Sequence, residues 1–259
     1  MSSYLKSEFY RLIHYKWTYL FIGICSVLLL SSNIVLAVVR STDSSFPYAT
    51  TKFSFSNAYN NMPIVFILCI MLAIMIFGNE HNNHTMKNCV TYGIPRGTIY
   101  LGKFLVQIAY AIIAFMIIIG VHILSGYLLL ENSGPKEFEL LIRTSLACLP
   151  FFIFGLATTN AFVFILEGVG SAVSVSCGIM LAFPLICNLL GMRFQAFEKL
   201  GGFLPWNIMS SIEYNQAEHT LHMFWDTATG FRNCWVFGII QTVLIVGIGY
   251  LLFRKKEIK

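Results

Sequence analysis

Long uncharged stretches alternate with short polar segments along the whole chain. Six stretches lack Asp, Glu, Lys and Arg and are about twenty residues or longer, the length that an α-helix needs to cross a bilayer. No gap between them is long enough for a folded soluble domain. The pattern predicts an all-α membrane protein with six transmembrane helices in a single transmembrane domain. The predicted spans are Trp17–Val39, Ala58–Gly78, Phe104–Leu130, Thr144–Leu166, Gly168–Met192 and Asn233–Phe253.

The composition of the chain agrees with a membrane protein. Of its 259 residues, 57% are apolar and 11% are charged, and the mean hydropathy is +0.72. Soluble domains carry about 25% charged residues. The seven cysteines include no C-x-x-C pair, which argues against a disulfide framework or a metal site. The net charge of +5 is spread over loops beside the spans, so we expect contact with membrane lipid and no nucleic acid partner.

Residues 1–16 have the pattern of a helix that lies in the membrane interface. Leu5, Phe9, Leu12 and Ile13 recur at helical spacing, and the opposite face is polar and basic. Such a helix buries its apolar face in the membrane and turns its basic face to anionic headgroups. We therefore expect an N-terminal amphipathic elbow helix that leads into the first span. The alternative is a disordered basic tail.

The distribution of Lys and Arg predicts that both termini lie in the cytosol. An even number of spans places the two termini on one side of the membrane. If that side is the cytosol, ten basic residues lie inside and seven outside, and the inside loops are shorter. An excess of Lys and Arg marks the cytoplasmic loops of membrane proteins.

The segment 80–96, between the second and third predicted spans, predicts a short cytosolic helix. Asn83 or Thr85 can cap its start, and Gly93 followed by Pro95 can end it. A helix of one or two turns is not stable alone, so we expect it to dock on another protein. Its apolar stripe would consist of Met86, Cys89 and Val90.

The segment 193–232, between the last two predicted spans, is too long for a simple turn. We expect an outer re-entrant segment, or short helices on the outer surface, broken at Gly201–Gly202 and at Pro205. Trp206 and Trp225 suit the depth of the membrane interface.

The fifth predicted span carries small residues at four-residue intervals, a spacing that lets helices approach closely. Packing within the chain and packing against a second copy remain equally compatible with it. The three residues are Gly170, Ser174 and Gly178.

The sequence carries no signature of catalysis. Gly97-x-x-x-x-Gly102-Lys103 matches the start of a phosphate-binding loop, but Phe104 follows where a hydroxyl should hold magnesium. Lys103 lies at the mouth of a span, where it can snorkel to the interface. His122 and Glu167 are the main polar exceptions in or beside the spans. We expect no catalytic residue and no cofactor in this chain, and any ATP and Mg²⁺ would belong to another polypeptide.

The segment after the second span resembles the corresponding loop of type-2 ABC exporter permeases. Those proteins show an acidic residue, a Gly-Thr pair, then Tyr-x-x-Pro or Ser-Arg, and a Lys opening the third span. The usual glycine is His84 here. The whole layout is similar as well, from the elbow helix to the re-entrant segment before the sixth span. The matching positions are Glu80, Thr85, Tyr92, Pro95, Arg96, Tyr100 and Lys103.

The resemblance implies a machine of two permeases, expected to be identical, and two cytosolic ATPases. Closure of the ATPases would push the coupling segment and switch access between the inner leaflet and the outside. Loop lengths are most similar to small permeases of Gram-positive bacteria that export bacteriocins, lantibiotics or phenol-soluble-modulin-type peptides, so a peptide cargo and the plasma membrane are expected. Export of small hydrophobic drugs or lipids, and a six-span channel or secondary transporter outside the ABC class, are the alternatives. The residues expected to couple to the ATPase are Glu80, Thr85, Met86, Val90, Tyr92 and Arg96.

Overall fold

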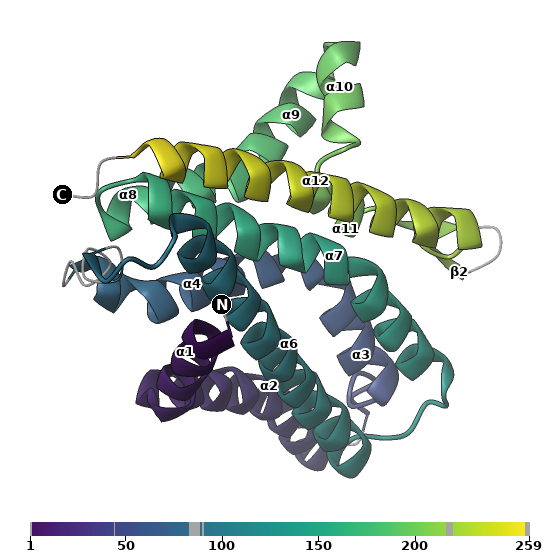
Figure 1. The fold of residues 1–259 in the computed structure, drawn as a ribbon. Coiled ribbons are helices and arrows are strands. Elements are labelled where there is room, and N and C mark those ends of the chain that lie inside the picture. Colours follow the sequence, from purple (N-terminus) through teal and green to yellow (C-terminus); the bar gives the residue numbers. More distant parts are fainter. Residues whose placement is uncertain (1, 44, 83–88, 90, 216–219, 257–259) are drawn as a thin grey trace.

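The structure is a computed structural model that describes residues 2–43, 45–82, 89, 91–215 and 220–256. Over these residues the chain is almost entirely helical and forms one bundle (Figure 1). Two short strands pair antiparallel into a hairpin, β1 (Ile212–Asn215) and β2 (Thr220–Met223). The helices are α1 (Ser2–His14), α2 (Lys16–Thr42), α3 (Thr51–Asn60), η1 (Met62–Ile64), α4 (Val65–Asn82), α6 (Arg96–Leu129), α7 (Lys136–Ile165), α8 (Val169–Cys177), η2 (Gly178–Ala182), α9 (Phe183–Gly191), α10 (Gln195–Gly201), α11 (Pro205–Met209) and α12 (Ala228–Lys255).

Long apolar helices confirm the prediction of an all-α membrane protein with several spans. Five helices in the described chain are long and apolar enough to cross a membrane: α2, α6, α7, α12 and the continuous unit Val169–Gly191. A sixth candidate is the pair Thr51–Asn60 and Met62–Phe77, which bends by 52°. The predicted number of six spans holds if this bent pair is counted as one span.

The second predicted span differs most from its expected bounds. Instead of one helix that starts near Ala58, the chain forms α3, breaks at Asn61, and continues through η1 into α4. Pro63 lies in the first turn of η1, where its missing N–H and fixed φ are tolerated. The sequence analysis did not predict α3, because more than half of its residues are polar. The start of α3 is capped by Thr50, whose hydroxyl accepts a hydrogen bond from the Phe53 N–H.

The fifth span contains one turn of π-helix, η2, between α8 and α9. Pro184 lies two residues after this turn and has no N–H to donate to the carbonyl of Met180, so the regular α-helical hydrogen bonding cannot continue through this point. A local π-helical turn gives the backbone groups freed by a proline in a membrane helix other hydrogen-bond partners.

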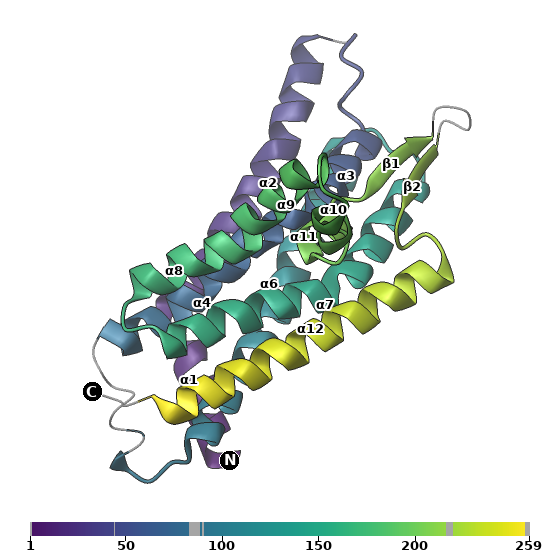
Figure 2. The ribbon, with the colours of Figure 1, turned by 90° about the horizontal axis from the view of Figure 1, so that it is seen from above.

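Helices α7 and α12 lie side by side along most of their length (Figures 1 and 2). Two glycines of α12 allow this close approach. A methyl group at Gly238 would lie 2.5 Å from the Pro150 Cβ, and one at Gly249 would lie 2.7 Å from the Ala161 Cβ. Small residues at such crossings are what membrane helices use to pack closely.

The bundle has two distinct ends (Figures 1 and 2). We call the end that holds α1, the start of α6 and the last turn of α12 the elbow end. The opposite end, with α3 and the β1–β2 pair, is called the hairpin end.

The predicted outer segment 193–232 contains two short helices, α10 and α11, but also the β-hairpin, which was not expected. Each strand has only four residues, too short for a clear alternating pattern. The side chain of Trp225, expected at the depth of the membrane interface, is fully buried among the helices and donates to the Thr144 hydroxyl of α7 at 3.1 Å.

The small-residue stripe of the fifth span faces away from the described chain. A methyl group at Gly170 or Gly178 would meet no heavy atom within 4 Å, and Ser174 is exposed. Packing within the described part of the chain therefore does not account for this stripe.

Candidate functional site

Helix α1 is fastened to the start of α6 by a buried ion pair. The Lys103 ammonium, with 2% of the residue exposed, lies 2.9 Å from a Glu8 carboxylate oxygen. The second Glu8 oxygen accepts from Arg11 at 2.7 Å, and the Phe77 ring lies 5.4 Å from the ammonium. The expectation that Lys103 snorkels outward is wrong, since Glu8 compensates its charge inside the bundle.

The predicted elbow residues divide between two surroundings. Leu12 is buried and Leu5 is half-buried, and both pack against the core of the bundle. Phe9 and Ile13 are exposed and available to lipid. Burial raises the pKa of the nearby Tyr4 phenol, and the Glu8 carboxylate adds to the rise. Helix α1 is therefore held by the bundle on one side and presents apolar residues on the other.

Arg96 fixes the first turn of α6 to the last turn of α12. Its guanidinium donates to the carbonyl oxygens of Arg254 and Lys256, each at 2.7 Å, and to that of Phe253 at 3.4 Å. The last carbonyls of a helix have no partner inside the helix and carry partial negative charge. The Arg96 guanidinium gives these carbonyl oxygens hydrogen-bond donors, and its positive charge balances their partial negative charge.

Lys256, at the end of α12, makes the same kind of contact with the end of α7. Its ammonium donates to the carbonyl oxygens of Phe164 and Leu166, at 3.3 and 3.1 Å, at the end of α7. Burial lowers the pKa of this ammonium, and the Glu167 carboxylate opposes the shift. Together, the two cations join the elbow ends of α6, α12 and α7 in series.

An aromatic cluster fills the space between these three helix ends. Tyr100 of α6 lies 5.1 Å from the Phe164 ring and 6.1 Å from the Phe253 ring, measured between centroids. All three rings are almost completely buried. Cys89, from the segment before α6, packs against the same cluster. The elbow ends of α6, α7 and α12 thus form one packed unit.

The residues expected to couple to an ATPase are only partly described. Tyr92 is 86% exposed, whereas Arg96 is half-buried in the contact with α12. The side chains of four others lie outside the residues that the structure describes: Glu80, Thr85, Met86 and Val90.

The helical turn at Cys89 and Thr91 ends at Gly93, as the sequence suggests. Gly93 has φ of 80°, a value that glycine adopts without strain, and the Ile94 N–H donates to the Cys89 carbonyl at 3.2 Å. This bond across a left-handed residue is a common way to end a helix. The chain then passes Pro95 and enters α6.

The positions shared with exporter permeases at the start of α6 join this helix to α1, α7 and α12. Arg96 contacts α12, Tyr100 packs between α7 and α12, and Lys103 holds α1. The sequence match to a phosphate-binding loop at Gly97 and Gly102, rejected above because Phe104 follows it, falls inside a regular helix, since both glycines lie in α6.

A comparison with protein families gives a direct match. The family described as ABC-2 family transporter protein matches residues 4–188, from α1 into α9. The chain belongs to the ABC-2 transporter family. No curated protein matches the sequence. Membership makes the chain a membrane permease, that is, a transport subunit and not the ATPase, and it implies a partner ATPase subunit. It also removes the alternative of a channel or secondary transporter outside the ABC class.

Proposed function

We propose that this ABC-2 permease exports amphipathic or hydrophobic peptides, of the bacteriocin or toxin type, by alternating access. Two permease copies would work with two ATPase subunits, which bind the ATP and Mg²⁺. The apolar spans support this cargo class, because a pathway lined by uncharged helices suits molecules that partition into the membrane. Small hydrophobic drugs or lipids fit the same spans. The similarity to small peptide-exporting permeases favours peptides.

The proposed setting is the plasma membrane of a Gram-positive bacterium, with the elbow end in the cytosol. The excess of Lys and Arg near the termini and the 80–96 segment supports this orientation. The stripe of small residues on α8 and η2 leaves a face open for close approach by a helix of the second permease.

The pair of helix-end contacts made by Arg96 and Lys256 is the observation that carries the coupling mechanism. A push on the 80–96 segment acts first on α6, which begins at Arg96. Arg96 holds the end of α12, and Lys256 at the end of α12 holds the end of α7. The three helices would then shift together as a packed unit, which is how small movements become two-state rearrangements.

The cargo proposal is tested by deleting the gene. Cells without it should become sensitive to an added amphipathic antimicrobial peptide, or retain such a peptide inside, while sensitivity to small hydrophobic dyes stays unchanged. Unchanged peptide export and peptide sensitivity across a broad panel would contradict the peptide assignment.

The coupling proposal is tested on the complex of permease and ATPase. We expect Met86→Asp with Val90→Asp to release the ATPase, since burying an unpaired carboxylate in a docking contact costs several kcal/mol per charge. We expect Arg96→Gln to leave the ATPase bound but to abolish most of its stimulation by peptide. The exposed Arg193 provides the control, Arg193→Gln, which should behave as wild type. Full ATPase binding by the first variant and full stimulation in Arg96→Gln would show that the assignment is wrong.

A further inference from the structure

A cavity of 560 Å³ lies between α2, α3, α4 and α6, away from the elbow end. Its size is in the usual range for sites that bind small molecules, about 300–1,000 Å³. It opens past exposed residues of α2 and α3, such as Ser32 and Asn57. None of the residues that line it is Asp, Glu, Lys or Arg.

One wall of the cavity is polar and rests on a buried network. The Ser54 hydroxyl donates to the Asn33 Oδ1 at 2.6 Å, and the Asn33 Nδ2 donates to the Ser125 Oγ at 2.7 Å and to the His122 carbonyl at 3.2 Å. Since the Ser54 proton is used, the His122 Nε2–H donates to the Ser54 Oγ across 3.4 Å. The network ties α2, α3 and α6 together and fixes the shape of this wall.

At the mouth, Asn57 of α3 and Asn61, the residue after α3, present two carboxamides beside this network. The Asn61 Nδ2 donates to the Asn57 Oδ1 and to the Asn57 carbonyl, both at 2.8 Å. Among the described hydrogen bonds, none uses the Asn57 Nδ2 or the Asn61 Oδ1. One donor and one acceptor are therefore presented side by side to whatever enters.

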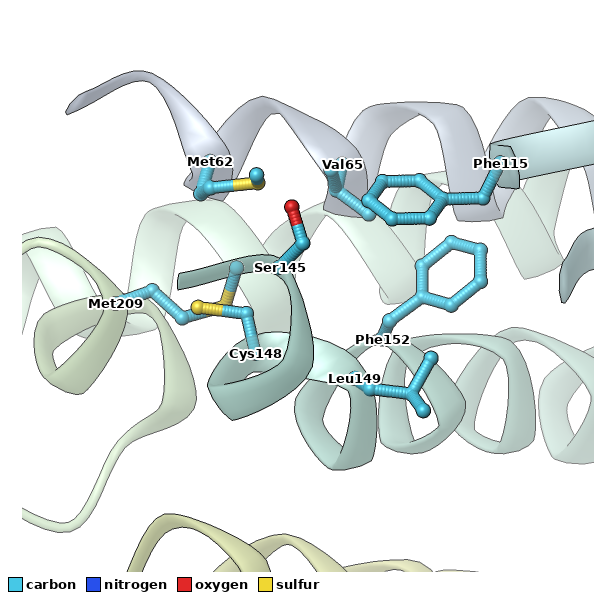
Figure 3. A pocket seen from close by; sticks show the side chains of 8 residues that line it. All are labelled: Met62, Val65, Phe115, Ser145, Cys148, Leu149, Phe152 and Met209. Carbon is cyan, nitrogen blue, oxygen red and sulfur yellow. The ribbon is translucent and has the colours of Figure 1, made fainter. Parts of the chain in front are cut away.

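The remaining walls are aliphatic and aromatic, with Leu36, Val65, Phe115 and Ile118 among them. Behind Val65 and Phe115 lies a smaller apolar void of about 10 Å³, room for one water molecule, between α4, α6, α7 and α11 (Figure 3). Met62, Val65 and Phe115 line both spaces. These three side chains separate the cavity from the interior of the bundle.

We infer that this cavity binds an uncharged segment of a peptide, with backbone amides on Asn57 and Asn61 and aliphatic side chains against Val65 and Ile118. This inference rests on the proposed peptide cargo. A peptide backbone offers alternating donors and acceptors, which a pair of carboxamides matches. A phospholipid headgroup would call for a cation, which the lining lacks, and an acyl chain would leave the polar wall unused. A segment with an ionised side chain would lose its hydration without gaining a partner.

The test uses the purified complex of permease and ATPase in nanodiscs. The probe is a tetrapeptide with a benzoylphenylalanine photocrosslinker, acetylated at its N-terminus and amidated at its C-terminus. The same peptide with a free C-terminal carboxylate and a phosphatidylglycerol with a diazirine in its acyl chain are the comparison probes. We expect the capped peptide to crosslink to residues of α2, α3 or α6 that line the cavity, and both comparison probes to crosslink there far less.

Two pairs of variants locate the site. Ile119→Trp fills the cavity from α6 and should weaken crosslinking about tenfold, whereas Ile113→Trp, on an exposed face of the same helix, should not change it. Asn57→Leu should weaken it about three- to tenfold, the effect of a lost hydrogen bond, and the neighbouring exposed Asn60→Leu should have no effect.

Crosslinks outside the cavity, equal losses in the control variants, or equal labelling by the carboxylate probe or the lipid would overturn the inference. Failure of the proposed function looks different. In that case the capped peptide still labels the cavity in a variant-sensitive way, but deletion of the gene leaves peptide export unchanged.

Discussion

The ion pair of Glu8 and Lys103 shows how a charge can be kept inside an apolar bundle. Moving a lone ammonium out of water is costly, and a buried pair is tolerated only when the partners meet closely and are otherwise satisfied. Here the 2.9 Å contact to Glu8 meets this condition, and Arg11 holds the second carboxylate oxygen. The pair therefore specifies where α1 docks on α6.

We predict that Lys103→Met destabilises the permease. Removing one member of a buried pair costs about 3–5 kcal/mol, because the other charge stays buried. We expect the lower part of this range, since Arg11 still contacts Glu8. Thermal unfolding in detergent measures the effect, with Lys6→Met, an exposed lysine of the same region, as the control.

The double variant Glu8→Gln with Lys103→Met distinguishes the loss of the ion pair from the cost of leaving one of its charges buried alone. It should unfold at a higher temperature than Lys103→Met alone, because no charge is left stranded. Losses that simply add in the double variant would show that the two residues act independently.

Among the described elements, α7 and α12 make the most extensive contact in the bundle. It depends on the absence of side chains at Gly238 and Gly249, and no property of α12 considered alone reveals this dependence. The same helix carries Gly247, which faces open space. The two kinds of glycine can be told apart only in the packed structure.

We predict opposite effects for alanine at these two kinds of position. Gly238→Ala forces the added methyl group against Pro150 and should cost about 1–3 kcal/mol, as overpacking does. Gly247→Ala meets no neighbour and should stabilise the helix by about 0.5–1 kcal/mol, because glycine loses more backbone entropy on folding. The unfolding temperatures of the two variants, compared with wild type, check this. A neutral Gly238→Ala would mean that α7 and α12 are not held at this distance.

For the whole molecule, the orientation in the membrane is the property on which the coupling proposal depends. The described chain places Tyr92 near the elbow end and Met192 at the end of α9, and each is 86% exposed. They are therefore a matched pair of positions for labelling from outside the cell.

We predict that an impermeant thiol reagent added to intact cells labels Met192→Cys and not Tyr92→Cys, in a background with the native cysteines replaced by alanine. After the cells are opened, both should be labelled. The reverse pattern in intact cells would place the elbow end outside and would end the coupling proposal, since a cytosolic ATPase could not reach it.

The sequence by itself determined the class of this protein and most of its helices. Uncharged stretches of bilayer length leave few alternatives to spanning helices, because backbone groups in lipid must be satisfied within the element. The same reasoning predicted the N-terminal helix and the helix end at Gly93. It failed where the pattern was weak, at the half-polar α3 and at the four-residue strands of the hairpin.

Only the tertiary structure decided what these residues contact. In the sequence, Glu8 is an acidic residue in a basic helix, and Lys103 is a lysine at the end of a span. They are 95 positions apart, and nothing in the sequence indicates that they form a pair. The same holds for Arg96 with α12, for Lys256 with α7, and for the network of Asn33, Ser54 and His122 beside the cavity. Local patterns along a chain report burial and secondary structure, whereas these contacts join helices far apart in sequence. They are set by how whole helix faces pack, which depends on many side chains at once.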